Sequence, residues 1–201
     1  MRRFSLQTVP TFVPAETRAY ACAQVYRGVF SERQCRRIVE QAVALTADDG
    51  RVGTGDTASD VRRSTVTWIP ATDATAWIVD KLTAVVRRAN RGYGFDLIGF
   101  TEDLQFTEYA GHGAHYAWHQ DGLDGELALR KLSIVVQLSP PDNYSGGRLE
   151  LFGVDVESWS ETTREQGTVV VFPSFEYHRV TPVESGTRRS LVCWVGGPPF
   201  R

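Results

Sequence analysis

Ala117-Trp118-His119-Gln120-Asp121 is the stretch on which the fold and the site of this chain depend, together with His178, which follows His119 by 59 residues. Residues two apart on a β-strand point to the same face, so His119 and Asp121 could hold one metal ion together. The segments between the two motifs have the pattern of strands, which can bring His178 back across a sheet as a third ligand. The sequence therefore predicts a β-rich fold with a metal site made of two histidines and one carboxylate.

Two imidazoles and one carboxylate suit non-haem Fe(II), because they leave positions on the metal open to other ligands. A plainer alternative is that His119 is a core histidine hydrogen-bonded to Asp121. That alternative needs neither His178 nor Arg188, which stands ten residues after His178. Since both are present and His178 lies on a predicted strand, the metal site is the preferred interpretation.

Two further histidines compete for a role. His115 and His119 are spaced like a helical zinc pair, but the stretch lacks the Glu of H-E-x-x-H, and Gly111 and Gly113 oppose a helix. On a strand, His115 would share the face of His119. It is therefore either a substrate contact or a residue that lines the mouth of the barrel without a role. His112 lies between the two glycines and is expected to be exposed.

Arg188 could bind the second substrate that an O2-activating iron site needs. An iron site that activates O2 needs electrons, and a 2-oxo acid can supply two of them by oxidative decarboxylation. The far carboxylate of such an acid needs a buried cation, and the fork of an arginine matches a carboxylate with two hydrogen bonds. Strand alternation places Arg188 and Ser190 on one face and Arg189 on the other. We therefore expect Arg188, and not Arg189, to bind the oxo acid.

These motifs resemble, in their order, those of the Fe(II)/2-oxoglutarate oxygenases, in particular the prolyl-4-hydroxylase-like branch, over about residues 104–200. Asp121 distinguishes the chain from the carrier-dependent halogenases, which have a small residue in that place. Trp194 stands where the nucleic-acid demethylases would have the second arginine of an Arg-x5-Arg pattern that begins at Arg188. Further motifs of the resemblance are Gln105-Phe106-Thr107-Glu108-Tyr109, Lys131-Leu132-Ser133, Gly146-Gly147-Arg148-Leu149 and Phe172-Pro173-Ser174.

The resemblance implies a double-stranded β-helix, or jelly roll, with the site at its open end. It assigns the three candidate ligands to iron and Arg188 to the distal carboxylate of 2-oxoglutarate. It also implies that Tyr109 lies near this cosubstrate and that Gln137 stands where some relatives have a tyrosine against the same carboxylate. The implied cofactors are Fe(II), 2-oxoglutarate as cosubstrate and O2, with stimulation by ascorbate.

Composition sets limits on the other functions of the chain. A net charge of -2 and a pI of about 6.1 over 201 residues argue against nucleic-acid binding, which needs a basic surface. No apolar stretch approaches the ~20 residues that span a bilayer, and residues 1–11 lack the apolar core of a signal peptide. Cys22, Cys35 and Cys193 have no C-x-x-C spacing, so neither a zinc knuckle nor a disulfide framework is expected. We therefore expect a cytoplasmic protein that binds neither nucleic acid nor membranes.

One domain is expected over residues 1–201, with a helical support region over 1–96 and a jelly-roll core that holds the metal site over 97–201. Ser31-Glu32-Arg33-Gln34 is a capping box that predicts a helix, and a second helix is expected from about Asp73 to Gly92 or Gly94. The fold class is mainly β with N-terminal helices (α+β), a cupin-like jelly roll. Strands are predicted at 63–69, 97–109, 115–121, 130–138, 148–152, 168–172, 178–182 and 190–195.

The expected activity is hydroxylation of an aliphatic C–H on an amino-acid-type substrate, either a prolyl or other residue of a peptide or a free amino acid. A tailoring oxygenase of a small natural product is an alternative. Two further alternatives are a non-enzymatic jelly roll that senses metal or oxo acid, and a cupin-like isomerase that needs no cosubstrate. Neither of these last two requires Arg188. Candidate substrate-side positions are the loop 50–60, Arg63, Trp68 and the segment 112–115.

Overall fold

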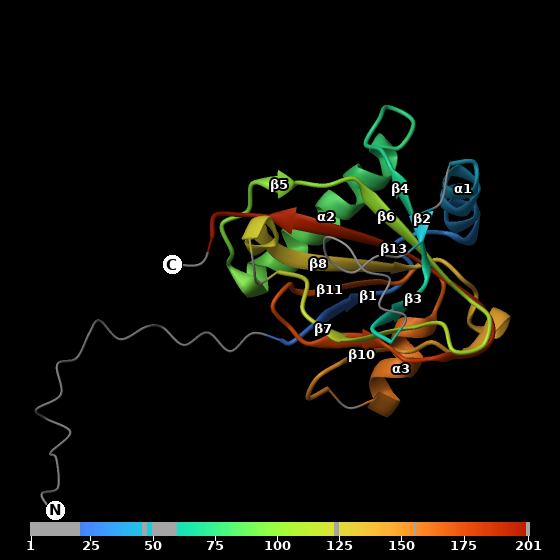
Figure 1. The fold of residues 1–201 in the computed structure, drawn as a ribbon. Coiled ribbons are helices and arrows are strands. Elements are labelled where there is room, and N and C mark those ends of the chain that lie inside the picture. The colour runs from blue at the N-terminus through green and yellow to red at the C-terminus, as the bar shows by residue number, and fades with distance from the viewer. Residues whose placement is uncertain (1–20, 46–47, 50–59, 123–124, 155, 200–201) are drawn as a thin grey trace, which may run out of the picture.

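Two antiparallel β-sheets face each other in the computed structural model, which describes residues 21–45, 48–49, 60–122, 125–154 and 156–199 (Figure 1). The helices α1 (Glu32–Val43) and α2 (Ala76–Tyr93) cover the outer face of the larger sheet. A third helix, α3 (Val156–Arg164), lies beside the smaller sheet. This layered, mainly β architecture with helices at the N-terminal side agrees with the sequence prediction.

The larger sheet has nine strands and the smaller one four, counted over the described residues. The order in the larger sheet is β1 (Gln24–Tyr26), β11 (Val169–Pro173), β8 (Arg130–Gln137), β13 (Val183–Gly196), β6 (Leu104–Ala110), β4 (Thr65–Ile69) and β2 (Asp48–Asp49), while β5 (Gly99–Phe100) and β9 (Tyr144–Gly146) also pair with β13. The order in the smaller sheet is β10 (Leu149–Leu151), β12 (His178–Val180), β7 (His115–His119) and β3 (Arg62–Arg63).

Strand β13 contributes side chains to both faces of the larger sheet. Leu191, Cys193 and Val195 alternate along it and pack into the core beneath α1 and α2. The residues between them point to the space between the two sheets, because successive side chains of a strand face opposite ways. Trp194 and Arg188 therefore face the inner side, where they line a cavity.

The ends of the two N-terminal helices follow the sequence signals. The Ser31 hydroxyl accepts a hydrogen bond from the backbone N–H of Gln34, and the Gln34 side chain accepts one from the backbone N–H of Ser31. This reciprocal pair satisfies two N–H groups that a helix start would otherwise leave open. Helix α2 ends at Gly94, whose φ of 69° is a left-handed conformation that glycine adopts without steric cost.

The N-terminal part of the chain contains more strand than predicted. Only 63–69 was expected to be a strand before residue 97, but β1 and β2 also pair with strands of the larger sheet. The segment 62–69 itself divides, so that β3 joins the smaller sheet and β4 the larger one. Helix α3 was not predicted. The single-domain organisation stays a prediction, and the loop 50–60 lies outside the described residues except for Asp60.

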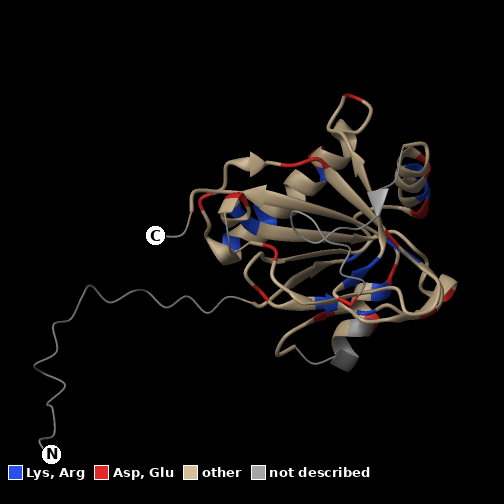
Figure 2. Cartoon of the chain, in the orientation of Figure 1, with Lys and Arg blue, Asp and Glu red and all other residues tan. Residues whose placement is uncertain are grey.

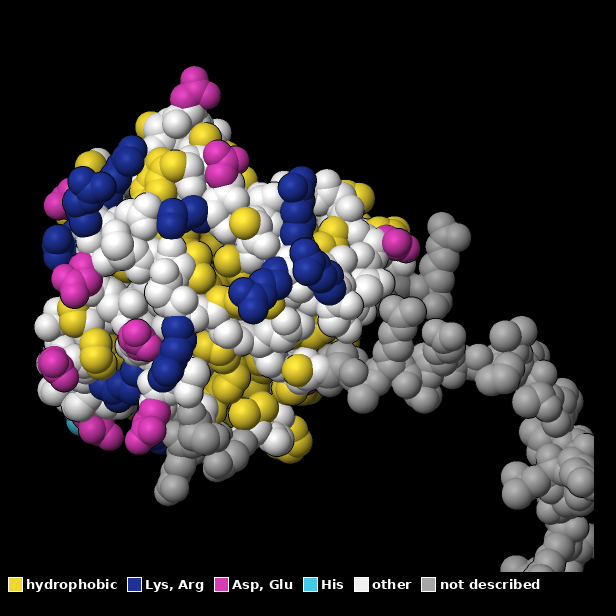
Figure 3. Space-filling model, turned by 180° about the vertical axis from the view of Figure 1, so that it is seen from behind, with side chains coloured by type: hydrophobic (Ala, Val, Ile, Leu, Met, Phe, Trp, Pro, Cys, Tyr) yellow, Lys and Arg dark blue, Asp and Glu magenta, His cyan; other side chains and the backbone are white. Residues whose placement is uncertain are grey.

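Charged residues are distributed over both sheets and the helices (Figure 2). On the face shown in Figure 3, Lys and Arg side chains form separate groups among acidic and hydrophobic ones. Within the described ranges, no helix is long and apolar enough to cross a membrane.

Replacing Ser31 with alanine should lower the free energy of unfolding by about 1 kcal/mol, because two N–H groups at the start of α1 lose their partners. Urea denaturation of the purified protein measures this difference. Arg33→Ala, on the exposed face of the same helix, is the control and should change stability by less than about 0.5 kcal/mol. Equal effects of the two substitutions would show that the capping box does not stabilise the helix.

Candidate active site

Pairing of β7 with β12 brings the two histidines together. His119 is the last residue of β7 and His178 the first of β12, and the two are directly opposite each other in the register of the strands. Asp121 lies two residues beyond the end of β7, so it is not on the strand as predicted, but it still turns toward both histidines. One ligand atom from each of the three residues lies within 4.8 Å of the other two.

Backbone carbonyls fix the orientation of both imidazole rings. Nδ1 of His119 lies 2.8 Å from the Ala117 carbonyl oxygen, and Nδ1 of His178 lies 3.0 Å from that of Glu176. Because a carbonyl oxygen can only accept, the proton resides on Nδ1 and the lone pair on Nε2. Each Nε2 lies 3.5 Å from an oxygen of Asp121, so both lone pairs point to the same small region.

Asp121 is held by two hydrogen bonds to one of its oxygens. The Ser133 hydroxyl donates to Oδ2 at 2.6 Å, and the Trp194 indole N–H donates to the same atom at 3.0 Å. Burial opposes ionisation of this carboxyl, but the adjacent His178 and His119 and the hydrogen bond from Ser133 hold its pKa well below the usual range. The second oxygen, Oδ1, lies toward His119.

Burial lowers the pKa of His178 to about 4, although the neighbouring Asp121 opposes this shift. Near neutral pH the ring is therefore uncharged, while the carboxylate is ionised. Metal ions bind to neutral imidazoles and ionised carboxylates. Both groups are therefore in the protonation states that metal binding requires.

The three residues open onto a cavity of about 840 Å³ between the two sheets. Its wall combines aromatic, aliphatic and charged side chains, including three arginines. The lining residues are Arg62, Trp68, Gln105, Tyr109, Tyr116, His119, Gln120, Asp121, Gly125, Glu126, Leu127, Arg130, Val135, Leu149, His178, Val180, Arg188, Ser190, Val192 and Trp194.

Arg188 lies in this cavity with 2% of its surface exposed. Its guanidinium donates to the Ser190 hydroxyl at 3.4 Å and lies 5.4 Å from the centre of the Tyr109 ring. No Asp or Glu of the described chain forms an ion pair with it. Arg189, by contrast, points to the other side of β13, where its Nε donates to Glu108 at 2.7 Å.

Gln137 is buried on β8 and has two protein partners. Its amide nitrogen donates to the Ser139 carbonyl at 3.2 Å and to the Tyr144 hydroxyl at 3.0 Å, and it is not among the residues that line the cavity. The contact of Gln137 with the cosubstrate stays a prediction. Tyr109, in contrast, is 3% exposed and lines the cavity next to Arg188.

Backbone carbonyls hold the ring of His115 outside the cavity lining. Its two ring nitrogens lie 2.8 Å from the Gly113 carbonyl oxygen and 3.2 Å from that of Asp60, and it does not line the cavity. His112 is exposed, as predicted. Among the proposed substrate-side residues, Trp68 lines the cavity, but Arg63 is exposed and points away from it.

Although its neighbour Arg63 was predicted as a substrate-side residue, Arg62 lines the cavity. Its guanidinium lies 4.6 Å from the centre of the Tyr116 ring, and this ring stacks on His119 with 3.5 Å between centres. Two adjacent arginines on a strand face opposite ways, so the sequence required one of them to be inside without indicating which one. Trp194 was also missed, although alternation from Arg188 along one strand would have found it.

Known proteins resemble this chain in both sequence and fold. Residues 104–196 match the family model described as the 2OG-Fe(II) oxygenase superfamily, in which 2OG stands for 2-oxoglutarate. A PKHD-type hydroxylase of Hyphomonas neptunium is 32% identical over 169 residues, which are 79% of this chain and 72% of the relative. A second PKHD-type hydroxylase, from a Synechococcus species, is 30% identical over 73% of this chain, and the match spans 65% of that relative.

Solved structures of prolyl hydroxylases share the fold. A Pseudomonas putida prolyl-4-hydroxylase superposes with a TM-score of 0.68 at 22% identity, covering 88% of this chain and 93% of that one. A Trichoplax adhaerens prolyl hydroxylase, in complex with a peptide of hypoxia inducible factor, gives a TM-score of 0.71 at 16% identity and covers 87% and 83% of the two chains. The predicted double-stranded β-helix is therefore confirmed.

Proposed function

Because the chain belongs to the 2OG-Fe(II) oxygenase superfamily, we propose that His119, Asp121 and His178 bind Fe(II) and that Arg188 binds the distal carboxylate of 2-oxoglutarate. The protein is a 2-oxoglutarate-dependent dioxygenase that uses Fe(II), 2-oxoglutarate and O2. The observation that carries the assignment is the convergence of three ligand atoms within 4.8 Å beside a buried arginine in the same cavity.

The donor set fits ferrous iron. Two neutral imidazoles and one carboxylate provide three of the positions of an octahedral ion, so that a chelating oxo acid and O2 have room. The Ala117 and Glu176 carbonyls accept hydrogen bonds from the two imidazoles, and Ser133 and Trp194 donate to Asp121. These contacts orient the three ligands before any ion arrives. When bound, iron would activate O2 with two electrons from the oxidative decarboxylation of 2-oxoglutarate to succinate and CO2, and one oxygen atom of O2 would be inserted into a C–H bond of the substrate.

The cavity also fits the cosubstrate. The cavity that holds the buried guanidinium of Arg188 has apolar side chains in its wall, among them Val135, Leu149, Val180 and Val192. Such a wall excludes water and thereby strengthens a charge-assisted hydrogen bond between the guanidinium and a carboxylate. Since 840 Å³ is in the upper part of the range for small-molecule sites, the cavity has room for a substrate as well.

The substrate class proposed is an amino-acid-type molecule that is hydroxylated on an aliphatic carbon. Support comes from relatives that are PKHD-type hydroxylases and from structural neighbours that are prolyl hydroxylases, one of them bound to a peptide. The Trp68 and Trp194 rings, 6.2 Å apart and both in the cavity wall, offer an apolar surface to the carbon skeleton.

Anaerobic titration tests the cofactor assignment. Fe(II) and 2-oxoglutarate added to the full chain without O2 should produce a visible charge-transfer band, since the oxo acid chelates the iron. Admission of O2 together with peptides or free amino acids should then release succinate faster than 2-oxoglutarate alone does. Absence of the band in the wild-type protein would contradict the proposed site.

Trp194→Phe should weaken Fe(II) binding by roughly 10- to 100-fold, because Asp121 loses one of the two donors that orient it. Fe(II) dissociation constants from anaerobic titration measure the effect. Trp77→Phe is the matched control, since its indole N–H is buried without a partner among the described residues and lies remote from the site. An equal loss of affinity in both variants would assign the effect to general packing.

A further inference from the structure

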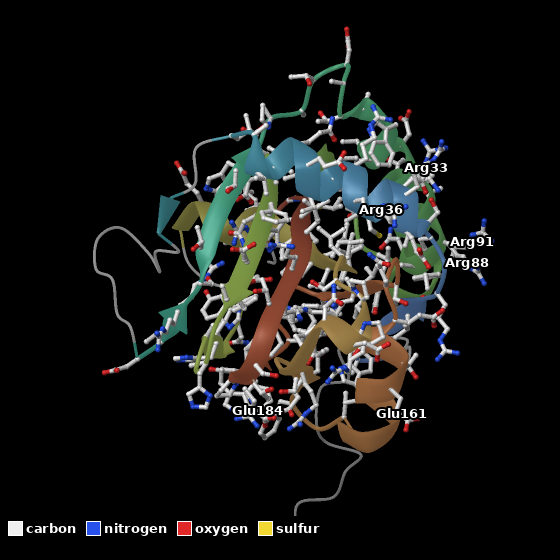
Figure 4. The ribbon with its side chains drawn as sticks, turned by 90° about the vertical axis from the view of Figure 1, so that its right-hand side faces the viewer. Arg33, Arg36, Arg88, Arg91, Glu161 and Glu184 are labelled. Atoms are coloured by element: carbon white, nitrogen blue, oxygen red, sulfur yellow. The ribbon has the colours of Figure 1, made fainter. Side chains whose placement is uncertain are left out.

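Two arginines of the described chain are buried, Arg62 at 8% and Arg188 at 2% exposure, and both line the active-site cavity. The other arginines of the described chain are half-buried or exposed. Arg130, also in the cavity wall, donates to both oxygens of Glu102, and Arg88 and Arg91 of α2 point away from the protein at one edge (Figure 4). Arg62, like Arg188, is therefore a buried cation in the wall of a cavity, as expected for a residue that binds an anion.

Arg62 has few protein acceptors. Its Nε donates to the Ser64 hydroxyl at 2.8 Å, and one Nη lies 3.5 Å from the Thr107 hydroxyl. A guanidinium has five N–H donors, so most of them have no acceptor among the described residues. Within that part of the chain, no Asp or Glu forms an ion pair with Arg62. A buried cation without an anionic partner is costly, and a bound anion removes the cost.

Strand β6 places the two arginines at neighbouring positions. Thr107 approaches Arg62, and Tyr109, two residues later on the same face, lies under Arg188. Two residues along a strand correspond to roughly 7 Å. Arg62 is also next to the metal ligands, because Tyr116, over which it lies, stacks on His119. Arg62 is therefore close to the metal ligands and occupies a different position from Arg188.

The buried charges of the site do not balance within the described part of the chain. Fe(II) brings two positive charges, and Arg62 and Arg188 bring one each. Asp121 and the two carboxylates of 2-oxoglutarate bring three negative charges. Arg130 and Glu102 cancel each other. Glu126 also lines the cavity, but it is exposed to water. Among the buried groups of the described chain, one excess positive charge therefore remains, and a substrate with a single carboxylate would neutralise it.

We propose that Arg62 anchors the carboxylate of the substrate, so that the enzyme acts on a small molecule of the amino-acid type with a free carboxylate. This inference rests on the proposed function, because it takes 2-oxoglutarate to be the partner of Arg188. Gln105, which lines the cavity and donates to Thr107 at 3.0 Å, holds that hydroxyl beside the guanidinium. An internal residue of a peptide has no carboxylate of this kind and would leave Arg62 without a partner.

The test uses the full chain loaded anaerobically with Fe(II) and 2-oxoglutarate. Each of the common free amino acids is titrated, and binding is read as a shift of the charge-transfer band. Every acid that binds is compared with its carboxamide and with its N-acetyl amide, which imitates an internal residue. The free acid should bind about 10- to 100-fold more tightly than either, as expected for a hydrogen bond to a charged group.

Substitutions then assign the effect to Arg62. Arg62→Met should bind the acid only as weakly as the amide, and Arg62→Lys should be intermediate, because the charge remains and the fork does not. Arg63→Met, at the exposed neighbouring position, should behave as the wild type. The affinity for 2-oxoglutarate should be the same in all of them.

Three results would overturn the proposal. The first is that no free acid binds, or that acid and amide bind equally well to the wild-type protein, a comparison that needs no variant. The second is a wild-type preference for acids in Arg62→Met. The third is a loss of 2-oxoglutarate affinity in Arg62→Met, which would assign this arginine to the cosubstrate. A wild-type protein that gives no charge-transfer band would instead contradict the proposed function.

Discussion

Alanine in place of His119, Asp121 or His178 should abolish turnover and lower the affinity for Fe(II) steeply. The described chain offers no other His, Cys, Asp or Glu close enough to complete a group of three ligands at this site. The loss should exceed the ~10- to 100-fold that follows from removing a hydrogen-bond partner of a ligand, because here the ligand itself is removed. Fe(II) titration and succinate release measure the two effects separately.

The control for these variants is His112→Ala. His112 is an exposed histidine that shortly precedes β7 in the sequence. Among the described residues, the only hydrogen-bond partner of its ring is the Glu184 carbonyl. It should leave both iron affinity and turnover within about twofold of the wild type, as is usual for surface substitutions. Near-normal turnover in any of the three ligand variants would show that the ligand assignment is wrong.

Arg188→Ala should raise the dissociation constant of 2-oxoglutarate by at least ~30-fold while iron stays bound. Loss of one partner of a buried charge-assisted pair costs on the order of 2–5 kcal/mol, which corresponds to roughly 30- to several-thousand-fold in affinity. Arg188→Lys should be intermediate, because an ammonium keeps the charge but cannot form the two parallel hydrogen bonds of the guanidinium. Anaerobic titration of the charge-transfer band gives the constants.

Arg189→Ala is the matched control on the next residue of the strand. Its guanidinium pairs with Glu108 on the opposite side of the sheet, where both side chains are partly exposed. Loss of such a pair changes stability by less than about 1 kcal/mol and should not affect the cosubstrate. An effect of Arg189 on 2-oxoglutarate affinity larger than that of Arg188 would contradict both the register of β13 and the role assigned to Arg188.

Residue spacing was sufficient to predict the elements that depend on local rules. The capping box at Ser31 located the start of α1 because its hydrogen bonds lie within four residues. Alternation along one strand separated Arg188 from Arg189 because the two faces of β13 have such different surroundings. The order of the motifs predicted the fold class because strand pairing must bring His178 opposite His119.

Features that depend on contacts distant in sequence were not predictable. Whether Arg62 or Arg63 enters the cavity depends on the pairing of β3 with β7, about 50 residues later in the chain. The partners of Gln137 depend on Tyr144, which β9 brings to the same place. Helix α3 is short, and the burial of its Trp159 against β10 stabilises it more than its own sequence does. In each case tertiary contacts outweigh the local pattern.

Alternation along β13 also has a consequence for how this enzyme can diversify. Arg188, Ser190, Val192 and Trp194 face the cavity, while Leu191, Cys193 and Val195 face the helices. Substitutions at Ser190 or Val192 can change the shape of the cavity without creating a void beneath α1 and α2. The insertion of a single residue, in contrast, would turn the cavity-facing side chains toward the helices and the core side chains toward the cavity. Both the core and the cavity would then be lost. Variation in what the enzyme accepts should therefore arise by replacement at alternate positions of this strand, and not by changes in its length.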